Sequence, residues 1–124
     1  MSMAFDRLHH MQLAMPRGEE SAARAFFVDV LGMVEVEKPP VLRTRGGAWF
    51  RAGDVELHLG IEDDFRPTRK RYPGIIVTDL DQVVLRLNQA GQDVRWDGDF
   101  PGDRRVYAHD PFGNRLEFLQ PASQ

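Results

Sequence analysis

The stretch His109-Asp110-Pro111-Phe112-Gly113-Asn114-Arg115-Leu116-Glu117-Phe118 predicts a β-hairpin near the end of the chain. Asp-Pro opens turns and Gly-Asn supplies residues that tolerate a positive φ, so the chain reverses direction here. Residues 105–108 and 116–119 alternate in polarity and are rich in strand formers. Because successive strand residues point to opposite faces, Glu117 faces away from Leu116 and Phe118. The hairpin therefore places an acid opposite its apolar residues.

Upstream of this hairpin, apolar periodicity predicts two successive sets of strands and helices. Phe26 and Phe27 belong to a stripe of helical spacing that ends at Gly32. In the second half, Asp81 is the predicted N-cap of a helix that ends at Gly91. The expected strands cover residues 6–15, 33–37, 48–51, 54–61, 72–78, 94–96, 104–109 and 115–120, and the first helix covers residues 19–31.

The order of these elements repeats, because each half is predicted to run β-α-β-β-β. The two helix-ending glycines are 91 − 32 = 59 residues apart, and Glu56 and Glu117 are 117 − 56 = 61 apart. A repeat of this kind predicts one domain over residues 1–124, built from a module at 5–64 and a second at 71–121. The predicted class is α+β, with the paired modules forming an open, cup-shaped mixed sheet and the helices on its outer face.

Composition limits the classes of partner. The chain has 124 residues, 42% of them hydrophobic, which is enough for one core. The formal net charge of −3 argues against a nucleic-acid partner and favours a small molecule or a protein. The sequence has no Cys, which leaves His, Asp, Glu and Tyr as possible metal ligands. The sequence has no apolar run of membrane-spanning length and no signal-like start. We therefore expect a cytoplasmic location and no membrane partner.

Alternation along the strands predicts a polar inner face. Its candidates are His10, Gln12, Trp49, Arg51, Glu56, His58, Tyr72, Arg105, Tyr107, His109, Arg115 and Glu117. A solvated sheet face would also carry such residues, but the repeat places a Glu in the corresponding strand of both halves. Trp49 and Tyr107 add aromatic walls of the kind that small-molecule pockets use. This face is therefore the candidate binding site.

Two groups of cations leave alternatives open. Residues 65–71 form a basic connecting segment, which is either a solvated linker or an anion-binding loop, and it hints at an acidic group on the ligand. Arg105 and Arg115 lie close to Glu117 in the predicted hairpin. They either form salt bridges with Glu117 or hold a substrate carboxylate.

Four features together resemble one known superfamily. They are the β-α-β-β-β repeat, the opening Leu8-His9-His10-Met11-Gln12-Leu13-Ala14-Met15-Pro16, the helix end Phe26-Phe27-Val28-Asp29-Val30-Leu31-Gly32-Met33, and the closing Asp110-Pro111-Phe112-Gly113-Asn114-Arg115-Leu116-Glu117-Phe118. Over nearly its whole length the chain resembles the vicinal oxygen chelate superfamily, which includes glyoxalases, extradiol dioxygenases, fosfomycin-modifying enzymes and bleomycin resistance proteins. Because one scaffold hosts many chemistries, the resemblance is specific for fold rather than for reaction.

The resemblance implies a metal site. By position, His10, Glu56 and Glu117 match ligands of metal-dependent members. The remaining ligand position, commonly a His, is Tyr72 here, and phenol is a poorer ligand for divalent metals than imidazole. His58 is a possible substitute because it shares the face of Glu56. A hard or borderline ion (Ni, Zn, Mn, Mg or Fe) would suit this set.

The function that the resemblance implies first is that of a metal-dependent, glyoxalase-like lyase or isomerase acting on a small vicinal-dioxygen substrate. Glu56 and Glu117 would be the catalytic proton carriers. Substrate contacts are expected from Trp49, His58, Tyr72, Tyr107 and Arg115. The alternative is a metal-free protein that sequesters a small molecule, as bleomycin resistance proteins do, and the third possibility is an extradiol-type dioxygenase. Relatives and the unpaired sheet edges both suggest a homodimer.

Overall fold

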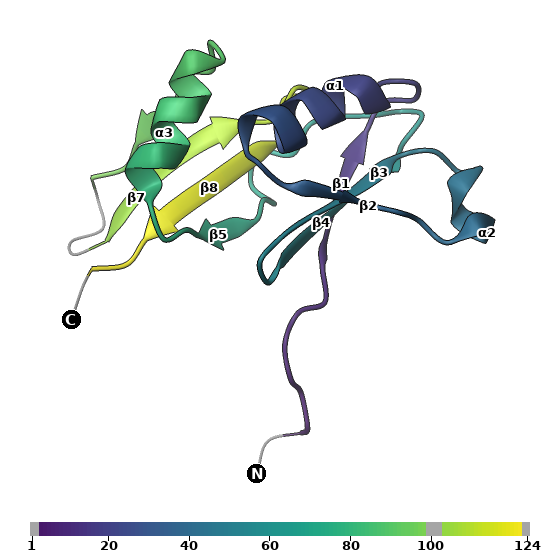
Figure 1. The fold of residues 1–124 in the computed structure, drawn as a ribbon, viewed down its shortest axis with the longest axis horizontal. Coiled ribbons are helices and arrows are strands. Elements are labelled where there is room, and N and C mark those ends of the chain that lie inside the picture. Colours follow the sequence, from purple (N-terminus) through teal and green to yellow (C-terminus); the bar gives the residue numbers. More distant parts are fainter. Residues whose placement is uncertain (1–2, 99–102, 123–124) are drawn as a thin grey trace.

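Two four-stranded β-sheets, one from each half of the chain, make up the computed structural model, which describes residues 3–98 and 103–122 (Figure 1). The strand orders are β1-β4-β3-β2 and β5-β8-β7-β6. The first half contains β1 (Met11–Met15), α1 (Glu20–Arg24), η1 (Ala25–Val30), β2 (Val34–Val36), α2 (Pro40–Arg43), β3 (Ala48–Ala52) and β4 (Val55–Ile61). The second half contains β5 (Gly74–Ile76), α3 (Leu80–Gln89), β6 (Arg95–Trp96), β7 (Arg104–His109) and β8 (Arg115–Gln120). The predicted α+β class with paired modules in an open arrangement is confirmed.

Both sheets follow one pairing scheme. In each half the first strand runs parallel to the last, β1 with β4 and β5 with β8, and the last strand also pairs antiparallel with the strand before it. The predicted terminal hairpin is present, with a ladder from Arg104–Gln120 to His109–Arg115. At its turn, Asp110 Oδ1 accepts hydrogen bonds from the backbone N–H groups of Phe112 and Asn114, at 3.0 and 2.8 Å. The buried carboxylate thus organises the reversal.

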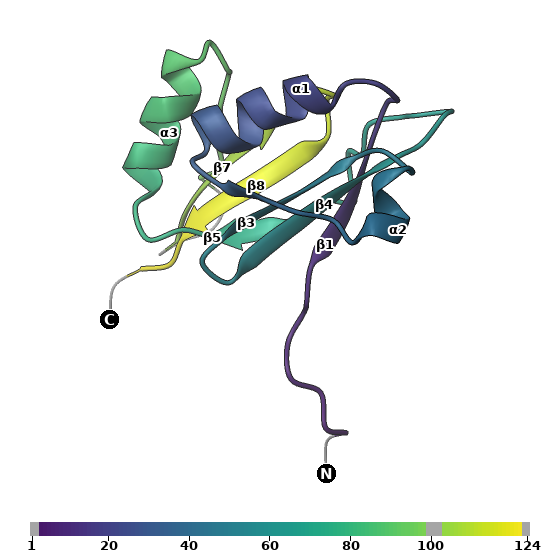
Figure 2. The ribbon, with the colours of Figure 1, turned by 45° about the vertical axis from the view of Figure 1, so that its right-hand side comes forward.

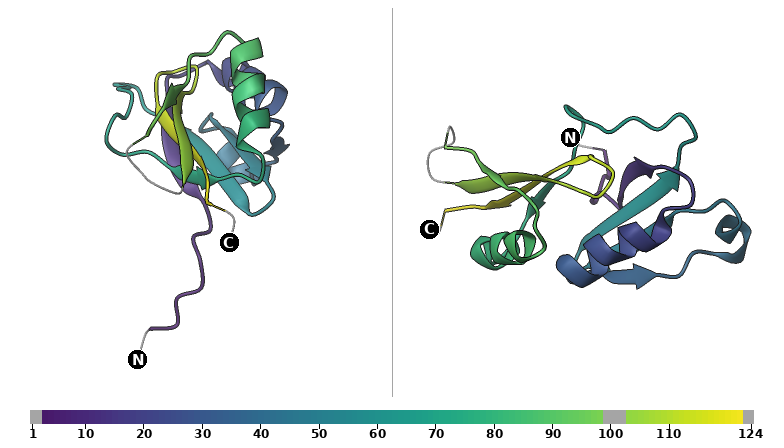
Figure 3. Two further views of the ribbon diagram at one scale, coloured as in Figure 1. Left: turned by 90° about the vertical axis from the view of Figure 1, so that its left-hand side faces the viewer. Right: turned by 90° about the horizontal axis from the view of Figure 1, so that it is seen from above.

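The helices cover one side of the two sheets. Seen from above, α1 with η1 and α3 lie on the same side of the strands, while the opposite faces remain uncovered by helices (Figure 3). The core lies between: Phe27 is fully buried and stacks on Phe50 of β3, with ring centroids 5.1 Å apart. Leu57 and Leu59 point into this core, so the residues between them on β4 face the other way.

Local differences from the expected elements have identifiable causes. The N-cap of α3 is Asp79, whose side chain accepts from Gln82 N–H, so the prediction of Asp81 as the cap is wrong. Asp81 lies in the first helical turn and instead pairs with Arg104 at 2.7 Å. The short helix α2 was missed: Pro40 stands at its first position, where proline's missing N–H costs no hydrogen bond.

The expected strands at both module starts are longer than the observed ones. Ladder pairing begins at Met11 in β1 and at Gly74 in β5, although strands were predicted from residues 6 and 72. Residues 3–10 instead extend away from the body beyond β1, as Figures 1 and 2 show. The apolar side chains of Phe5 and Leu8 in this arm are 90% and 83% exposed. In the part of the chain that the structure describes, no helix is long and apolar enough to span a membrane.

Candidate functional site

The face of the first sheet opposite the helices carries the first group of candidate residues. On β4, Glu56 and His58 occupy it because they alternate with buried Leu57 and Leu59. The strand register sets Trp49 beside His58 and Arg51 beside Glu56 on β3, and Gln12 beside His58 on β1. Alternation in three paired strands thus gathers polar and aromatic side chains on one surface.

His58 lies between two other rings. Its imidazole stacks on Trp49 with a centroid distance of 4.0 Å and an interplanar angle of 4°, and on His10 at 3.9 Å and 15°. His58 is only 4% exposed as a result. His10 itself is exposed and belongs to the extended arm, so one face of His58 is covered by a residue outside the sheet. The three-ring stack brings together two predicted substrate-contact residues and the predicted metal ligand His10.

Glu56 is held by two partners on this surface. One carboxylate oxygen lies 2.8 Å from Arg51, and the other lies 2.6 Å from His58 Nε2. The hydrogen bond from His58 and the nearby Arg51 guanidinium lower the pKa of Glu56. Burial lowers the pKa of His58, against the opposing effect of Glu56. At neutral pH the pair is therefore an ionised carboxylate and a neutral imidazole.

This charge state determines the tautomer of His58. An ionised carboxylate only accepts hydrogen bonds, so Nε2 must carry the proton that it donates to Glu56. The lone pair of the neutral ring then resides on Nδ1. A carboxylate that orients an imidazole in this way is the arrangement found in general-base pairs.

The second sheet carries the corresponding acid. Glu117 on β8 lies 2.7 Å from Arg105 on β7, and both side chains are largely buried. Of the two readings left open for Arg105, the salt bridge is the one observed. Arg115 behaves differently, because its guanidinium lies 4.0 Å from the ring centroid of Tyr107 and 5.1 Å from that of Tyr72. A cation over two phenol rings is a cation–π arrangement.

The two tyrosines form an aromatic corner. Their ring centroids are 5.9 Å apart with an interplanar angle of 87°, and the Tyr107 hydroxyl donates to Asp97 at 3.1 Å. Burial, together with the neighbouring Tyr72 and Asp97, raises the pKa of Tyr107 to about 12. Asp97 was not among the sequence candidates. It follows a two-residue strand and carries no periodic signal that would have singled it out.

The predicted site residues thus fall into two clusters. The first-sheet cluster contains His10, Trp49, Glu56 and His58, and the second-sheet cluster contains Tyr72, Tyr107, Arg115 and Glu117. Within residues 3–98 and 103–122, no three His, Asp or Glu side chains are grouped so that they could hold a metal ion. The donor set His10, Glu56 and Glu117 does not fit a metal ion within one chain as it stands here. Its role as a ligand set stays a prediction.

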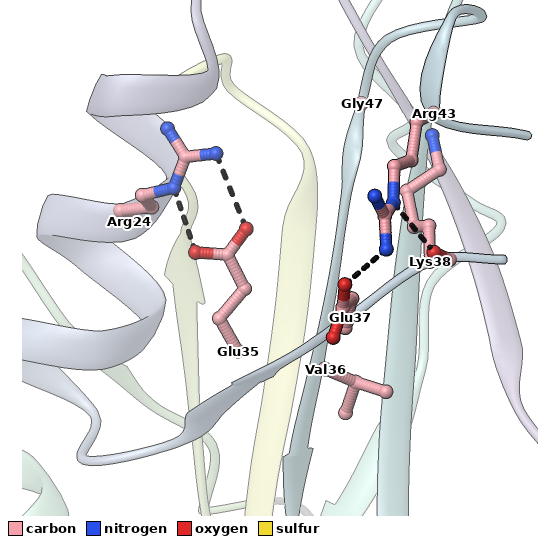
Figure 4. A pocket seen from close by; sticks show the side chains of 7 residues that line it. All are labelled: Arg24, Glu35, Val36, Glu37, Lys38, Arg43 and Gly47. Atoms are coloured by element: carbon pink, nitrogen blue, oxygen red, sulfur yellow. Dashed lines mark hydrogen bonds and ion pairs between the residues drawn. The ribbon is translucent and has the colours of Figure 1, made fainter. Parts of the chain in front are cut away.

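A cavity of about 430 Å³ lies away from these clusters, beside α1, β2 and α2 (Figure 4). Most of its charged side chains already have partners. Arg24 pairs with Glu35 at 2.7 Å, and Arg43 donates to Glu37 and to the backbone oxygen of Lys38, as the dashed lines in Figure 4 show. Lys38 in turn donates to a backbone carbonyl. We therefore assign no ligand to this cavity.

Solved structures resemble the whole chain. A glyoxalase family protein from Bacillus anthracis is 39% identical over 98% of this chain and 99% of its own, with a TM-score of 0.93. A glyoxalase/dioxygenase from Nostoc punctiforme is 22% identical over 94% and 92% of the two chains, with a TM-score of 0.75. TnmS3, an antibiotic binding protein from Streptomyces sp. CB03234, is 23% identical over 98% and 100%, with a TM-score of 0.72. The last two similarities concern the fold alone.

None of the curated proteins compared with this sequence matches it. The sequence model of one family does match, over residues 7–118, which is nearly the whole chain and includes both polar clusters. With this match, the paired sheets and the polar faces opposite their helices, the chain belongs to the Glyoxalase/Bleomycin resistance protein/Dioxygenase superfamily.

Proposed function

We propose that this chain is a glyoxalase-like lyase or isomerase that moves a proton within a small vicinal-dioxygen substrate. The observation that carries the proposal is the hydrogen bond of 2.6 Å between His58 and Glu56 on the polar face of the first sheet. A neutral imidazole oriented by an ionised carboxylate accepts a proton from a carbon next to a carbonyl or hydroxyl. Proton transfer of this kind is the step shared by isomerases and many lyases.

The two partners of Glu56 support this role. Arg51 and His58 stabilise the carboxylate, so it can stabilise the imidazolium formed when His58 takes up a proton. Burial of His58 between Trp49 and His10 keeps the ring neutral before that step. Because His10 lies on the exposed arm, its displacement would open His58 to a substrate. In this proposal, Glu56 acts on the proton through His58.

The substrate would lie against the aromatic side chains of both clusters. Trp49 provides a flat apolar surface beside His58, while Tyr72 and Tyr107 provide another beneath Arg115. Glu117, held by Arg105, is the proposed second proton carrier. Small-molecule sites commonly combine such aromatic walls with a few charged groups.

A divalent metal (Ni, Zn, Mn, Mg or Fe) is the cofactor proposed for this activity, with His10, Glu56 and Glu117 as its ligands. The two sheets of one chain do not bring these donors together, so the metal-dependent form of the proposal requires a rearrangement or a second copy. We derive no reaction step through the ion. A dioxygenase would need a set of two His and one carboxylate, with His58 in place of the His that is missing at Tyr72.

A homodimer is part of the proposal for a physical reason. Strands β1 and β5 stand at the edges of their sheets, and an edge strand can pair with another chain. Ile76 of β5 and the arm residues Phe5 and Leu8 are large, apolar and exposed, which favours burial against another chain. A cytoplasmic location is also part of the proposal.

One experiment tests the proton-transfer role directly. Purified protein is incubated in D₂O with a panel of small 2-hydroxyketones and 2-oxoaldehyde adducts, and hydrogen exchange at the carbon is followed by NMR. We expect exchange with the unaltered chain and with His109→Gln, whose exposed histidine lies on the other sheet, and loss of exchange in His58→Gln. Exchange that is absent across the panel, or that survives in His58→Gln, overturns the proposal.

The metal is tested separately by elemental analysis and by thermal shift with each of the five ions. We expect bound metal and a shift in the unaltered chain, and loss of both in His10→Ala and Glu117→Gln. If no ion binds or shifts the melting temperature, the metal-dependent form is wrong. Metal retained after both substitutions contradicts the ligand assignment instead.

A metal-free binding protein is the second candidate function. The observation that favours it is the three-ring stack of Trp49, His58 and His10, which offers a planar ligand a ready stacking surface. Quenching of Trp49 fluorescence by an aromatic cation, with no turnover and no effect of metal, would support this function. Replacement of Trp49 by Leu should then abolish the quenching, while replacement of Trp96 should not.

A further inference from the structure

A second cavity lies beside β1 and the end of β4. It has a volume of about 390 Å³ and lies between β1, the end of β4 and the connecting residues 62–73. Two arginines of the basic connecting segment, Arg66 and Arg71, line it together with Thr68 and Gln12. Glu62 is the acid of the lining, so the lining has an excess of one positive charge, two minus one. This local charge stands on a chain whose net charge is −3.

The two arginines have no ionic partner in the described parts of the chain, residues 3–98 and 103–122. Some other surface arginines are paired with acids, as Arg17 is with Asp63 just beyond β4. A guanidinium presents its donors in a planar fork that matches the two oxygens of a carboxylate or a phosphate-like group. Arg66 and Arg71 therefore remain available to such a group.

Thr68 adds an unsatisfied donor to the same wall. Its backbone is held on both sides, because its N–H donates to Asn114 Oδ1 and its C=O accepts from Arg115 N–H, each at 3.2 Å. Its hydroxyl oxygen is buried and has no hydrogen-bond partner among the described residues. A buried polar group of this kind calls for a partner, and Thr68 is one of the residues that line the cavity.

Gln12 connects the cavity to His58. Its amide nitrogen lies over Gly60, so close that a Cβ at position 60 would be 2.6 Å away. Because residue 60 is a glycine, the Gln12 amide has room to lie at the cavity wall. In the strand register Gln12 pairs with His58. Gln12 is therefore the lining residue that stands beside His58 in the sheet.

We infer that this cavity binds an oxyanion group, either a carboxylate or a phosphate-like group, of the small molecule handled by the polar face. Arg66 and Arg71 neutralise its charge, and Thr68 and Gln12 donate hydrogen bonds. The inference rests on the proposed function only in placing the reacting part of that molecule beside His58. The substrate class is thereby narrowed to small anions.

The test uses the full chain with inorganic phosphate and with malonate as probes. Binding is followed through backbone amide signals in two-dimensional NMR, with sodium chloride at equal ionic strength as the blank. Comparison of the two probes shows whether the site prefers the planar carboxylate groups of malonate or the tetrahedral phosphate. We expect saturable shifts at residues 66–71 and at Gln12 with at least one probe.

Two matched double variants identify the site. Arg66→Gln with Arg71→Gln removes the cavity cations, while Arg69→Gln with Lys70→Gln removes two charges from the same segment that do not line the cavity. Both change the net charge from −3 to −5. We expect the first pair to weaken binding about tenfold or more, which corresponds to one lost charge-assisted contact. The second pair should stay within about twofold, since it alters only screened, distant charge. Thr68→Val should weaken binding by a smaller factor.

The outcomes separate this inference from the proposed function. Equal weakening by both double variants, or the absence of saturable shifts with either probe, overturns the anion site. Binding that persists in His58→Gln, while proton exchange is lost, supports both assignments. If no substrate is turned over but anion binding depends on Arg66 and Arg71, the proposed reaction fails and the anion site stands.

Discussion

Replacing Asn114 by Ala should destabilise the protein strongly, because this side chain joins three separate segments. Asn114 is fully buried behind the hairpin turn. Its amide nitrogen donates to the backbone oxygen of Ala14 at 2.8 Å and to Asp110 Oδ2 at 2.9 Å. Its amide oxygen accepts from Thr68 N–H at 3.2 Å. The first half, the connecting segment and the second half thus meet at one residue.

The expected magnitude follows from the groups that truncation leaves behind. A methyl side chain in place of the Asn114 amide cannot satisfy the Ala14 carbonyl, the Asp110 oxygen or the Thr68 N–H, and each unmet buried group costs about 1 kcal/mol or more. The free energy of unfolding should therefore fall by about 3 kcal/mol. For a domain of this size the melting temperature should fall by about 10 °C.

The assay is urea-induced unfolding followed by circular dichroism, with linear extrapolation to zero denaturant. Asn88→Ala is the matched control, because Asn88 is exposed on α3 and alanine is the better helix former. This control should be neutral or slightly stabilising. A loss below about 1 kcal/mol in Asn114→Ala would refute the reasoning, since it would mean that water or repacking satisfies all three groups.

Three further outcomes are expected. Gly47→Ala should lower the melting temperature far more than Gly18→Ala. Both glycines have a positive φ, but a Cβ at position 47 would lie 2.1 Å from Leu59 O, whereas a Cβ at position 18 meets nothing within 4 Å. Equal decreases in melting temperature would contradict the predicted clash. Because burial lowers the pKa of His58, the unfolded chain takes up the proton first, and unfolding free energy measured in urea should fall as pH drops below about 6.5. His58→Gln should reduce the dependence of the unfolding free energy on pH. An unchanged pH dependence in this variant would contradict the role of His58. Absorbance titration should show Tyr107 still protonated near pH 11, below its pKa of about 12, and Tyr107→Phe should remove the late phenolate signal.

The fold was largely predictable because its signals are local. Alternation placed Leu57 and Leu59 in the core and Glu56 and His58 opposite them, and the observed burial of the leucines confirms the prediction. The hairpin at Asp110 could be predicted because its turn residues are contiguous in the chain. The cap of α3 was less predictable, since two aspartates stand two residues apart and only the backbone geometry selects Asp79.

The interaction partners of the site residues were harder to predict from the sequence. Sequence alternation indicated that Glu56, His58 and Glu117 share polar faces, but it could not say which charge each acid meets. Strand register decided that Arg51 lies beside Glu56, and side-chain packing paired Arg105 rather than Arg115 with Glu117. Asp97 contacts the site through the Tyr107 hydroxyl, and no local sequence pattern encodes a contact between a strand and the residue that follows another strand.

The sequence by itself determined the repeated order of elements and the faces of the strands, because hydrophobic periodicity and turn chemistry act over a few residues. Its motifs carried the resemblance to the superfamily, and the family match over residues 7–118 established membership. The tertiary structure decided that His10 stacks on His58, that Glu56 and Glu117 stand on separate sheets, and that Arg66 and Arg71 line a cavity beside Gln12. These features depend on strand register, sheet placement and ring packing between distant segments. Such long-range contacts lie beyond the reach of local periodicity.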